Sequence, residues 1–430
     1  MVTLLFGTLA VCLILTVPIG ISLALASVAV ISTGYSSEML NMLAQSTVTA
    51  LDNFTLMAIP FFMLLGIVME KTGIAKDLVG FAEAMVGQKA GSLGNACIVA
   101  CAFFAAISGS GPACVAAIGG VMVPIMIEEG YPKGYSGAIA AAGSTIGPVI
   151  PPSIPLIVYG ATVGVSVTGL FAAGVIPGIA MAVVLIAWNK YVCKKHGYGA
   201  AKSGHPTAGI SKWTAFKKAF WSILMPVIVL GGIYGGVFTP TEASVVGVVY
   251  ALVVGTFVYR RLTWRIFLDC LTETAVTASA VLIIMGAATT FGRIITLERV
   301  PEMLAAWMLS VSESPFVIML MINILLLIAG MFIDTTSNVI LFAPLFCPIV
   351  SALGYDLTYF GIVMCINLCI GFLTPPLGVN LFVAQRVSGT TLEDVIRYTW
   401  PMIIVLTLLM VVVIAFPAIS LFLPKLMGIV

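Results

Sequence analysis

Long apolar runs separated by short polar loops make up most of the chain. Ten of the runs predict membrane-crossing helices, and none shows the two-residue alternation of a membrane β-strand. They lie at residues 2–16, 18–34, 50–70, 133–160, 165–192, 219–238, 242–259, 274–296, 357–387 and 393–424. The pattern predicts an all-α polytopic membrane protein. The first run is expected to remain as a span, because it lacks the basic start and the small-residue cleavage site of a signal peptide.

Two of these runs contain prolines and glycines in their middle. They read GSTIGPVIPPSIPL at residues 143–156 and INLCIGFLTPPLGVNL at residues 366–381. Proline removes a backbone donor and frees a carbonyl one turn earlier, and unpaired backbone groups are costly in hydrocarbon. Such a sequence is tolerated where protein, water or a ligand satisfies the backbone. We therefore expect broken helices that line a cavity, at 133–160 and 357–387.

Two further apolar segments, 92–128 and 314–352, are interrupted midway by the polar stretches ISGSGPAC and FIDTTSNV. A polar tip at membrane depth is tolerated where it lines a cavity, so we expect re-entrant hairpins. Pairs of crossing helices would leave the topology unchanged. An amphipathic stretch precedes each segment, at Ala75–Gln88 and Arg299–Leu309, and is predicted to be an interfacial arm helix.

The two halves of the chain repeat each other at an offset of 224 residues. Residues 124–152 align without a gap on residues 348–376, and 10 of the 29 positions are identical, including the Gly-Tyr and Pro-Pro pairs. Each half has five predicted crossings, an odd number, so the second half must be inverted relative to the first. We expect an N-terminal inverted repeat at 1–192, a basic linker at 193–218 and a C-terminal inverted repeat at 219–430.

Charged residues indicate how the chain lies in the membrane. They make up 8% of the residues, and 61% are hydrophobic, whereas soluble domains have roughly 25% charged residues. The segment 189–218 carries seven lysines and no acid, so it is expected in the cytoplasm. The N-terminus is then periplasmic. With this orientation, 16 of the 19 Lys and Arg residues lie on the cytoplasmic side, and only Arg293, Arg299 and Lys425 lie on the periplasmic side.

Several kinds of chemistry are disfavoured by the residue inventory. Both histidines lie in the polar loop, which argues against haem or catalytic zinc. The cysteine pairs Cys97–Cys101 and Cys365–Cys369 lie four residues apart in apolar helices, as core residues do. The chain has no HExxH or GxSxG motif. We expect neither an enzyme, nor an organic cofactor, nor a nucleic-acid partner.

The breaks and hairpin tips carry the atoms that a cation and an acid need. Carbonyl and hydroxyl oxygens suit a small hard cation, and helix N-termini beyond a break suit a carboxylate. Asp334 is the only acid predicted deep in the membrane, where it serves the site or caps a helix. A proton relay would need more titratable groups, so Na⁺ is the expected coupling ion.

Candidate residues follow from this chemistry, although any single Ser or Thr can instead bond the carbonyl four residues earlier. The candidate sodium ligands are Ser108, Gly109, Thr145, Gly147, Pro148, Asp334, Thr335, Gly371 and Thr374. The candidate substrate contacts are Ser108, Ser110, Pro152, Ser153, Ser337, Asn338 and Asn380.

The motifs SGSGPA, GPVIPPSIPL and GFLTPPLGVNLF, with GYP before the first broken helix, resemble those of a known family. It is the large membrane subunit of TRAP (tripartite ATP-independent periplasmic) transporters, and the resemblance covers essentially all 430 residues. It implies an ion-transporter-like fold with an elevator motion in the bacterial inner membrane. By motif, the sodium and substrate regions are Ser108–Pro112 with Gly147–Pro152, and Asp334–Asn338 with Thr374–Asn380.

The resemblance also implies partners and a substrate class. It implies sodium-driven uptake of an organic acid, delivered by a periplasmic binding protein, and a small four-helix membrane subunit, expected here as a separate chain. Members carry C4-dicarboxylates, sialic acid, other sugar acids or amino-acid-like compounds. The many neutral polar groups favour a monocarboxylate with polar substituents as the substrate. Arg293 and Arg386 lie at predicted helix ends and are expected to be interfacial anchors.

Two other functions stay open. A stand-alone sodium/organic-anion carrier of the same architecture would need no partner. A membrane anchor or ion-translocating subunit of a redox complex would need titratable residues in mid-membrane or haem-ligating histidines, and the sequence shows neither feature.

Overall fold

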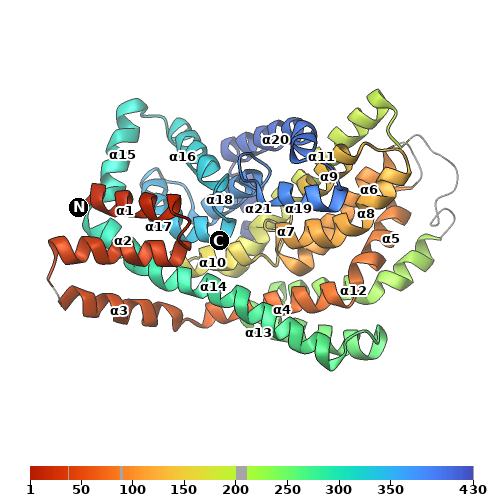
Figure 1. Cartoon of the computed structure of the whole chain (residues 1–430), viewed down its shortest axis with the longest axis horizontal. Helices are drawn as coiled ribbons and strands as arrows, with labels where there is room; N and C mark the ends of the chain where they lie inside the picture. Colours follow the sequence, from red (N-terminus) through yellow and green to blue (C-terminus); the bar gives the residue numbers. More distant parts are fainter. Residues whose placement is uncertain (37, 88–90, 200–210, 430) are drawn as a thin grey trace.

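The computed structural model describes residues 1–36, 38–87, 91–199 and 211–429, and every regular element in these ranges is a helix (Figure 1). The first half contains α1 (Val2–Ile14), α2 (Ile19–Gly34), α3 (Glu38–Leu51), a 3₁₀ turn η1 (Phe54–Met57), α4 (Ala58–Lys71), α5 (Ile74–Val86), α6 (Ser92–Ser108), α7 (Gly111–Cys114), a π-helical turn η2 (Val115–Gly119), α8 (Gly120–Glu128), α9 (Lys133–Ser144), α10 (Ile154–Val163) and α11 (Val167–His196). The second half contains α12 (Lys212–Tyr234), α13 (Pro240–Val253), a π-helical turn η3 (Val254–Val258), α14 (Trp264–Leu297), α15 (Val300–Val311), α16 (Pro315–Gly330), α17 (Thr335–Ala352), α18 (Leu357–Gly371), α19 (Val379–Ser388), α20 (Leu392–Ala415) and α21 (Ala418–Leu426).

The helices of the two halves match in order and position at the 224-residue offset. The second leg of the first hairpin, Gly111–Glu128, coincides with α17 after this shift, and α9 begins where α18 begins. In Figure 1, α6 and α8 lie at the right end of the molecule and α16 and α17 at the left end. The hairpins therefore approach the centre from opposite ends. The fold is two inverted-topology repeats, each with a re-entrant hairpin and a broken helix.

Packing between the halves is reciprocal. Helix α4 packs on α13, and its equivalent, the second part of α14, packs on α2. Likewise α10 packs on α17, whereas α19 packs on η2 and α8. Each contact therefore has a partner in which the two halves exchange roles, as a two-fold axis between them requires.

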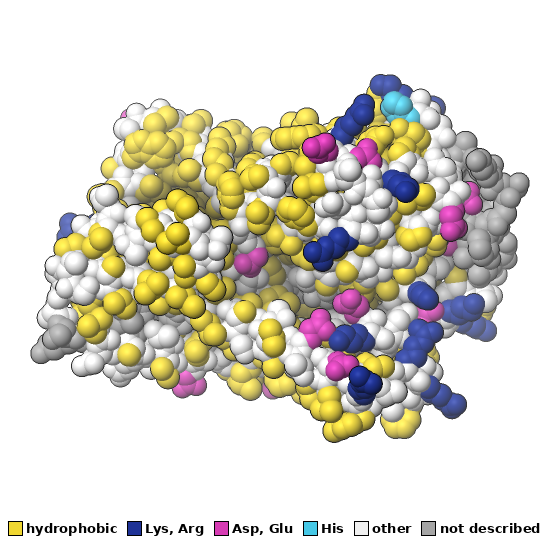
Figure 2. Space-filling view, in the orientation of Figure 1, with side chains coloured by type: hydrophobic (Ala, Val, Ile, Leu, Met, Phe, Trp, Pro, Cys, Tyr) yellow, Lys and Arg dark blue, Asp and Glu magenta, His cyan; other side chains and the backbone are white. Residues whose placement is uncertain are grey.

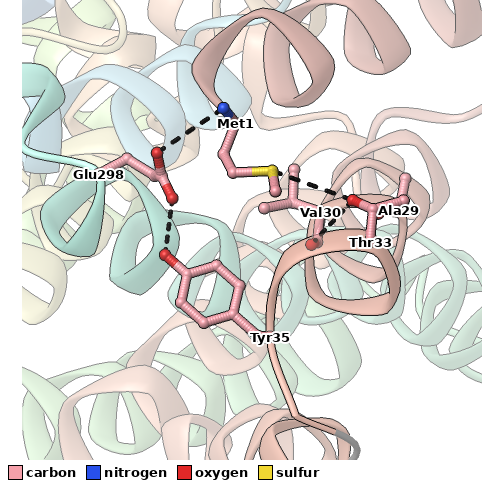
Figure 3. A network of polar contacts seen from close by, with 6 residues as sticks. All are labelled: Met1, Ala29, Val30, Thr33, Tyr35 and Glu298. Atoms are coloured by element: carbon pink, nitrogen blue, oxygen red, sulfur yellow. Dashed lines mark hydrogen bonds and ion pairs between the residues drawn. The ribbon is translucent and has the colours of Figure 1, made fainter.

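At the arm helices α5 and α15, a tyrosine from each half lies next to a carboxylate from the other half. The Tyr35 hydroxyl, at the end of α2, donates to Glu298 Oε1 at 2.6 Å, just before α15 (Figure 3). Its equivalent, Tyr259 at the end of η3, faces Asp77 on α5. Burial raises the pKa of the Asp77 carboxyl, and the hydrogen bond with Tyr259 partly offsets this rise. Helices α5 and α15 confirm the two predicted amphipathic helices, and Gln88, the predicted end of the first, lies outside the described residues.

Eight helical segments of the described residues are long and apolar enough to cross a membrane. The predicted spans at 2–16 and 18–34 form helices of only 13 and 16 residues. Apolar side chains cover much of the molecule's left half in Figure 2, and Lys and Arg side chains gather over the right half. This is the surface of a multi-pass membrane protein with one strongly charged end.

The scaffold helices differ from the prediction in two places. The predicted span at 274–296 is part of α14, which runs for 34 residues, whereas its equivalent in the first half is divided into α3, η1 and α4. The division arises at Asn53, whose side chain accepts a hydrogen bond from the Thr55 N–H at 2.9 Å and starts a new helix. Thr277 occupies the equivalent position inside α14, where its hydroxyl donates to the carbonyl of Glu273.

The second difference is at the C-terminal end. The predicted span at 393–424 is two helices, α20 and α21, separated at Phe416 and Pro417. Proline disfavours the helical conformation in the residue before it, and Phe416 is non-helical with φ −125° and ψ 80°. The helices also extend beyond the predicted linker boundaries, because α11 ends at His196 and α12 begins at Lys212.

Candidate functional site

The tip of the first hairpin rests on the first helix break. Helix α6 ends at Ser108, and Gly109 has a left-handed backbone with φ +60° that turns the chain toward Ser110. A side chain at Gly109 would begin 2.7 Å from the Pro152 carbonyl oxygen, and one at Gly147 would begin 3.3 Å from the Ser110 carbonyl oxygen. Two predicted candidate regions, far apart in sequence, are therefore in backbone contact.

The second tip and the second break meet in the same way. A Cβ atom at Gly371, the last residue of α18, would lie 2.6 Å from the carbonyl carbon of Gly330, the last residue of α16. Asp334 caps α17, where it accepts hydrogen bonds from the Ser337 N–H at 3.0 Å and from the Ser337 hydroxyl. Its role as a helix cap is confirmed, and its side chain is exposed.

The second break also reaches the first tip. A Cβ atom at Gly111 would lie 3.1 Å from Asn380 Oδ1 and 3.5 Å from the ring of Phe372. The Asn380 Nδ2 group donates to the carbonyl of Ala141 in α9 at 3.3 Å. Residues 372–380 therefore connect the two tips, and the four predicted regions form one continuous centre.

Four buried side-chain oxygens around this centre have no hydrogen-bond partner: Thr335 Oγ1, Asn338 Oδ1, Asn367 Oδ1 and Asn380 Oδ1. Their residues are at most 2% exposed. Buried polar atoms without a partner are rare because desolvation is costly, and each one indicates an unmet ligand, ion or water. All four are neutral oxygens that can coordinate a hard cation.

Several predicted oxygens are engaged within the protein instead. The Thr145 hydroxyl donates to the Ala142 carbonyl at 2.6 Å, and the Thr374 hydroxyl donates to the Ile370 carbonyl at 2.9 Å. Their donors are thus used locally, although their oxygens can still accept or coordinate. Ser108 is buried at the end of α6, and the exposure of Ser110 is intermediate.

Pro148 and Ser153 are engaged with each other. The Ser153 hydroxyl donates to the Pro148 carbonyl and accepts from the Leu156 N–H at 3.3 Å, which caps α10. The same carbonyl accepts a contact from Cys365 Sγ at 3.0 Å. These atoms hold the first break against α18, so both residues serve the shape of the break.

The two helix breaks differ in how far their residues are exposed. Pro152 and Ser153 are buried, whereas the equivalent Pro376 and Leu377 are exposed. The Pro151–Pro152 and Pro375–Pro376 peptide bonds are both cis. Access to the centre is therefore greater at the second break.

Sequence reasoning missed Asn367 and Asn323. Asn367, at 0% exposure in α18, donates through Nδ2 to the Asn323 carbonyl at 2.7 Å and to Asn323 Oδ1 at 2.8 Å. A usable signal was present, because each is a single amide within an apolar helix, where polar residues are costly. The amide pair joins α16 to α18 beneath the second tip.

Neither a cluster of metal-ligating side chains nor a reactive thiol marks this centre. No group of three or more His, Cys, Asp or Glu in the described ranges could hold a metal ion. All nine cysteines are buried and free, and the core role predicted for Cys97, Cys101, Cys365 and Cys369 is confirmed. A cation here would be held by neutral oxygens together with the carboxylate of Asp334.

Comparisons with known proteins point to one family. The family model described as "Tripartite ATP-independent periplasmic transporter, DctM component" matches residues 6–419. The isethionate TRAP transporter permease protein DctMQ of Oleidesulfovibrio alaskensis is 42% identical over 420 residues. The match covers 97% of this chain and 65% of that protein, so the chain spans less than two thirds of that relative's length.

Two further relatives match over nearly their whole length. The sialic acid TRAP transporter large permease protein SiaM of Vibrio cholerae is 38% identical, over 99% of both chains. The C4-dicarboxylate TRAP transporter large permease protein DctM of Pseudomonas aeruginosa is 38% identical, over 92% of both. Among solved structures, the YdaH transporter of Alcanivorax borkumensis matches with a TM-score of 0.62 over 88% of both chains, at 16% identity, which supports the fold alone.

Proposed function

This chain belongs to the DctM component family of tripartite ATP-independent periplasmic transporters, and from that premise we propose that it is a large permease subunit that takes up an organic acid with Na⁺. The family assignment confirms the resemblance carried by the SGSGPA and proline-rich motifs. It also identifies the chain as a component of a multi-pass membrane transporter.

The observation that supports coupling to Na⁺ is the set of four unpartnered buried oxygens at the tips and breaks. A cation would satisfy atoms whose desolvation is otherwise uncompensated, and neutral oxygens suit Na⁺ better than a proton relay. Thr335 and Asn338 would hold the ion at the second tip, and Asn380 at the point where the second break meets the first tip. The substrate's carboxylate would neutralise part of the ion's charge.

The proposed substrate is an organic acid of the sialic acid or C4-dicarboxylate class. The three relatives named above are described as permeases for isethionate, sialic acid and C4-dicarboxylates, which are all organic anions. Asn338 and Asn380 offer amide groups at the centre, and such groups suit a carboxylate with polar substituents. Ser108, Ser110 and Ser337 are the other proposed contacts from the tips.

The family supports a proposal about partners, and the distribution of basic residues supports one about orientation. We propose a small four-helix membrane subunit and a periplasmic binding protein as partners, with the N-terminus in the periplasm. The lysine-rich end of α11 and the start of α12 would then face the cytoplasm, in agreement with the concentration of basic side chains at the right of Figure 2. This arrangement puts the protein in the bacterial inner membrane.

We further propose an elevator motion between two parts of the molecule. The hairpins and broken helices would move against a scaffold formed by α1–α4 and α12–α14. The close packing of Gly66 in α4 on Ser108, and of Gly292 in α14 on Pro344, would lie on the sliding surface. Small residues at such a contact let two backbones approach and separate without side-chain interlocking.

Sodium-gradient uptake in proteoliposomes tests the proposal directly. The chain, its small subunit and a cognate binding protein are reconstituted and tested against N-acetylneuraminate, succinate and isethionate. We expect uptake that requires Na⁺ and the binding protein. Uptake by the chain alone would instead identify a stand-alone carrier, and uptake without a sodium gradient would contradict the coupling.

A matched pair of variants tests the ion site. Thr335→Val removes an unpartnered oxygen at nearly constant shape, whereas Thr399→Val removes a buried hydroxyl that donates to the Val395 carbonyl at 2.8 Å in α20. We expect Thr335→Val to raise the Na⁺ concentration for half-maximal uptake at least about tenfold, because one ligand is lost. Thr399→Val should leave that concentration unchanged, and an equal effect of both variants would contradict the assignment.

A further inference from the structure

A cavity of about 630 Å³ lies away from the tips, between scaffold helices and the proposed moving part. Its walls come from the α3–η1 junction and α14 on one side and from α10 and α17 on the other. Its polar lining consists of Thr49, Asp52, Asn53, Thr162, Thr289, Arg293 and Thr296. The lining residues of α14 lie at 285–297, toward the end of the helix that the predicted topology assigns to the periplasm.

Arg293 gives this cavity a fixed positive charge. Its Nη1 group donates to the Ser46 hydroxyl at 2.8 Å, which uses one of the five guanidinium N–H donors and orients the side chain. Asp52 lines the same cavity, yet the ion pairs of the described residues, Met1–Glu298 and Lys71–Glu273, include neither Arg293 nor Asp52. Within the described residues, no carboxylate forms an ion pair with the Arg293 guanidinium.

The fold itself does not require these polar groups. At the 224-residue offset, Met69 is the equivalent of Arg293 and Val276 is the equivalent of Asp52. Met69 is fully buried in the hydrophobic core, so an apolar side chain satisfies the same helix position in the other half. The charged lining is thus specific to one face of a molecule whose halves otherwise match, which indicates a role in binding.

We infer that this cavity is an outer binding site for an organic anion, with groups in its lining that can also bind hydroxyl or amino substituents of the acid. The guanidinium of Arg293 can hold a carboxylate or sulfonate through two parallel N–H···O bonds. Asp52 and Asn53 can accept hydrogen bonds from the substituents, and Met285, Ile340 and Pro344 provide apolar contact. The volume lies within the range of ligand pockets, about 300–1,000 Å³.

The identity of the anion rests on the proposed function: it is the transported acid, bound here before it reaches the hairpin tips. Gly292 and Pro344 both line the cavity, one from the scaffold and one from the second hairpin, so the elevator motion would change its shape. An acid bound here is therefore expected to favour the arrangement in which both walls are in place.

A cysteine-protection experiment on the full chain in lipid nanodiscs tests the site without requiring transport. Thr296→Cys puts a thiol at the exposed rim of the cavity, and Thr272→Cys puts a matched thiol on the same helix outside it. All nine native cysteines are buried, so labelling by N-ethylmaleimide reports the introduced thiol. We expect N-acetylneuraminate, succinate or isethionate to slow labelling at Thr296→Cys but not at Thr272→Cys.

The charge variants decide whether Arg293 is responsible. We expect Arg293→Gln to raise the half-protecting acid concentration at least about tenfold, because a charge-assisted pair is lost. Arg299→Gln, which removes an exposed arginine outside the cavity, should not change it. Absence of protection by all three acids, or equal protection in Arg293→Gln, would overturn the proposal.

A tip variant separates this site from the proposed transport site. Thr335→Val should impair sodium-dependent uptake and leave protection at Thr296→Cys intact. If the Thr296→Cys protein, with the tips unaltered, shows protection without sodium-dependent uptake, the outer site stands and the proposed function fails. If it shows uptake without protection, the proposed function stands and the outer site fails.

Discussion

At the scale of single residues, the centre depends on the absence of side chains as much as on their presence. Gly330 and Gly371 bring the second tip and the second break into backbone contact, and Gly109 and Gly147 do the same in the first half. The glycines therefore allow each hairpin tip to approach a helix break to within backbone contact.

Substitution of Gly371 tests this dependence. We expect Gly371→Ala to destabilise the protein by about 1–3 kcal/mol or more, because the new methyl group would lie 2.6 Å from the backbone of Gly330. Thermal unfolding followed by size-exclusion chromatography in detergent measures the loss. Gly120→Ala is the control, since a Cβ atom at Gly120 meets no atom within 4 Å. Equal melting temperatures for both variants would contradict the close contact.

The sequence predicted which short regions meet, but not what each atom in them does. The Pro-Pro and SGSG stretches could be recognised because broken backbone in an apolar run has few explanations. Whether Ser153 contacts substrate or caps α10 depends on its position relative to the Pro148 carbonyl, which no local pattern specifies. Asn367 was missed because a single amide gives no periodic signal.

At the scale of elements, hydropathy predicted the existence of the helices better than their ends. The halves were expected to match, yet α14 is continuous where α3, η1 and α4 are separate. The new helix start in the first half is capped by Asn53, where the second half has Thr277 inside α14. Similarly, Pro417 divides α20 from α21 within an apolar run, where a hydropathy pattern registers no boundary.

The cap at Asn53 can be tested by itself. We expect Asn53→Ala to lower the free energy of unfolding by about 0.5–2 kcal/mol, because the Thr55 N–H loses its acceptor. Asn53→Ser retains a capping oxygen and should restore most of the stability. Chemical unfolding monitored by tryptophan fluorescence measures both variants. If Asn53→Ser is as unstable as Asn53→Ala, the helix start is determined by another contact.

At the scale of the whole molecule, the contact between α14 and α17 offers a direct test of motion. A Cβ atom at Gly292 would lie 3.7 Å from the Pro344 Cβ, within the range of about 3.5–4.5 Å that a disulfide requires. We expect Gly292→Cys combined with Pro344→Cys to form a disulfide that stops uptake, with recovery after reduction. Uptake assays before and after dithiothreitol measure the effect.

The single variants Gly292→Cys and Pro344→Cys control for the substitutions themselves. Each should keep its uptake under oxidising conditions, because the native cysteines are buried and offer no partner for exchange. Complete cross-linking with unchanged uptake would show that α14 and α17 stay together throughout the cycle. The elevator proposal would then require a different sliding surface.

The reciprocal packing of α4 on α13 and of α14 on α2 has the geometry of a homodimer whose subunits are now joined in one polypeptide. In a true homodimer, every substitution appears twice, once on each face. A duplicated and fused gene removes that constraint. One copy can then carry Arg293 and Asp52 while the other retains Met69 and Val276, so the two faces of a symmetric framework can acquire separate chemistries.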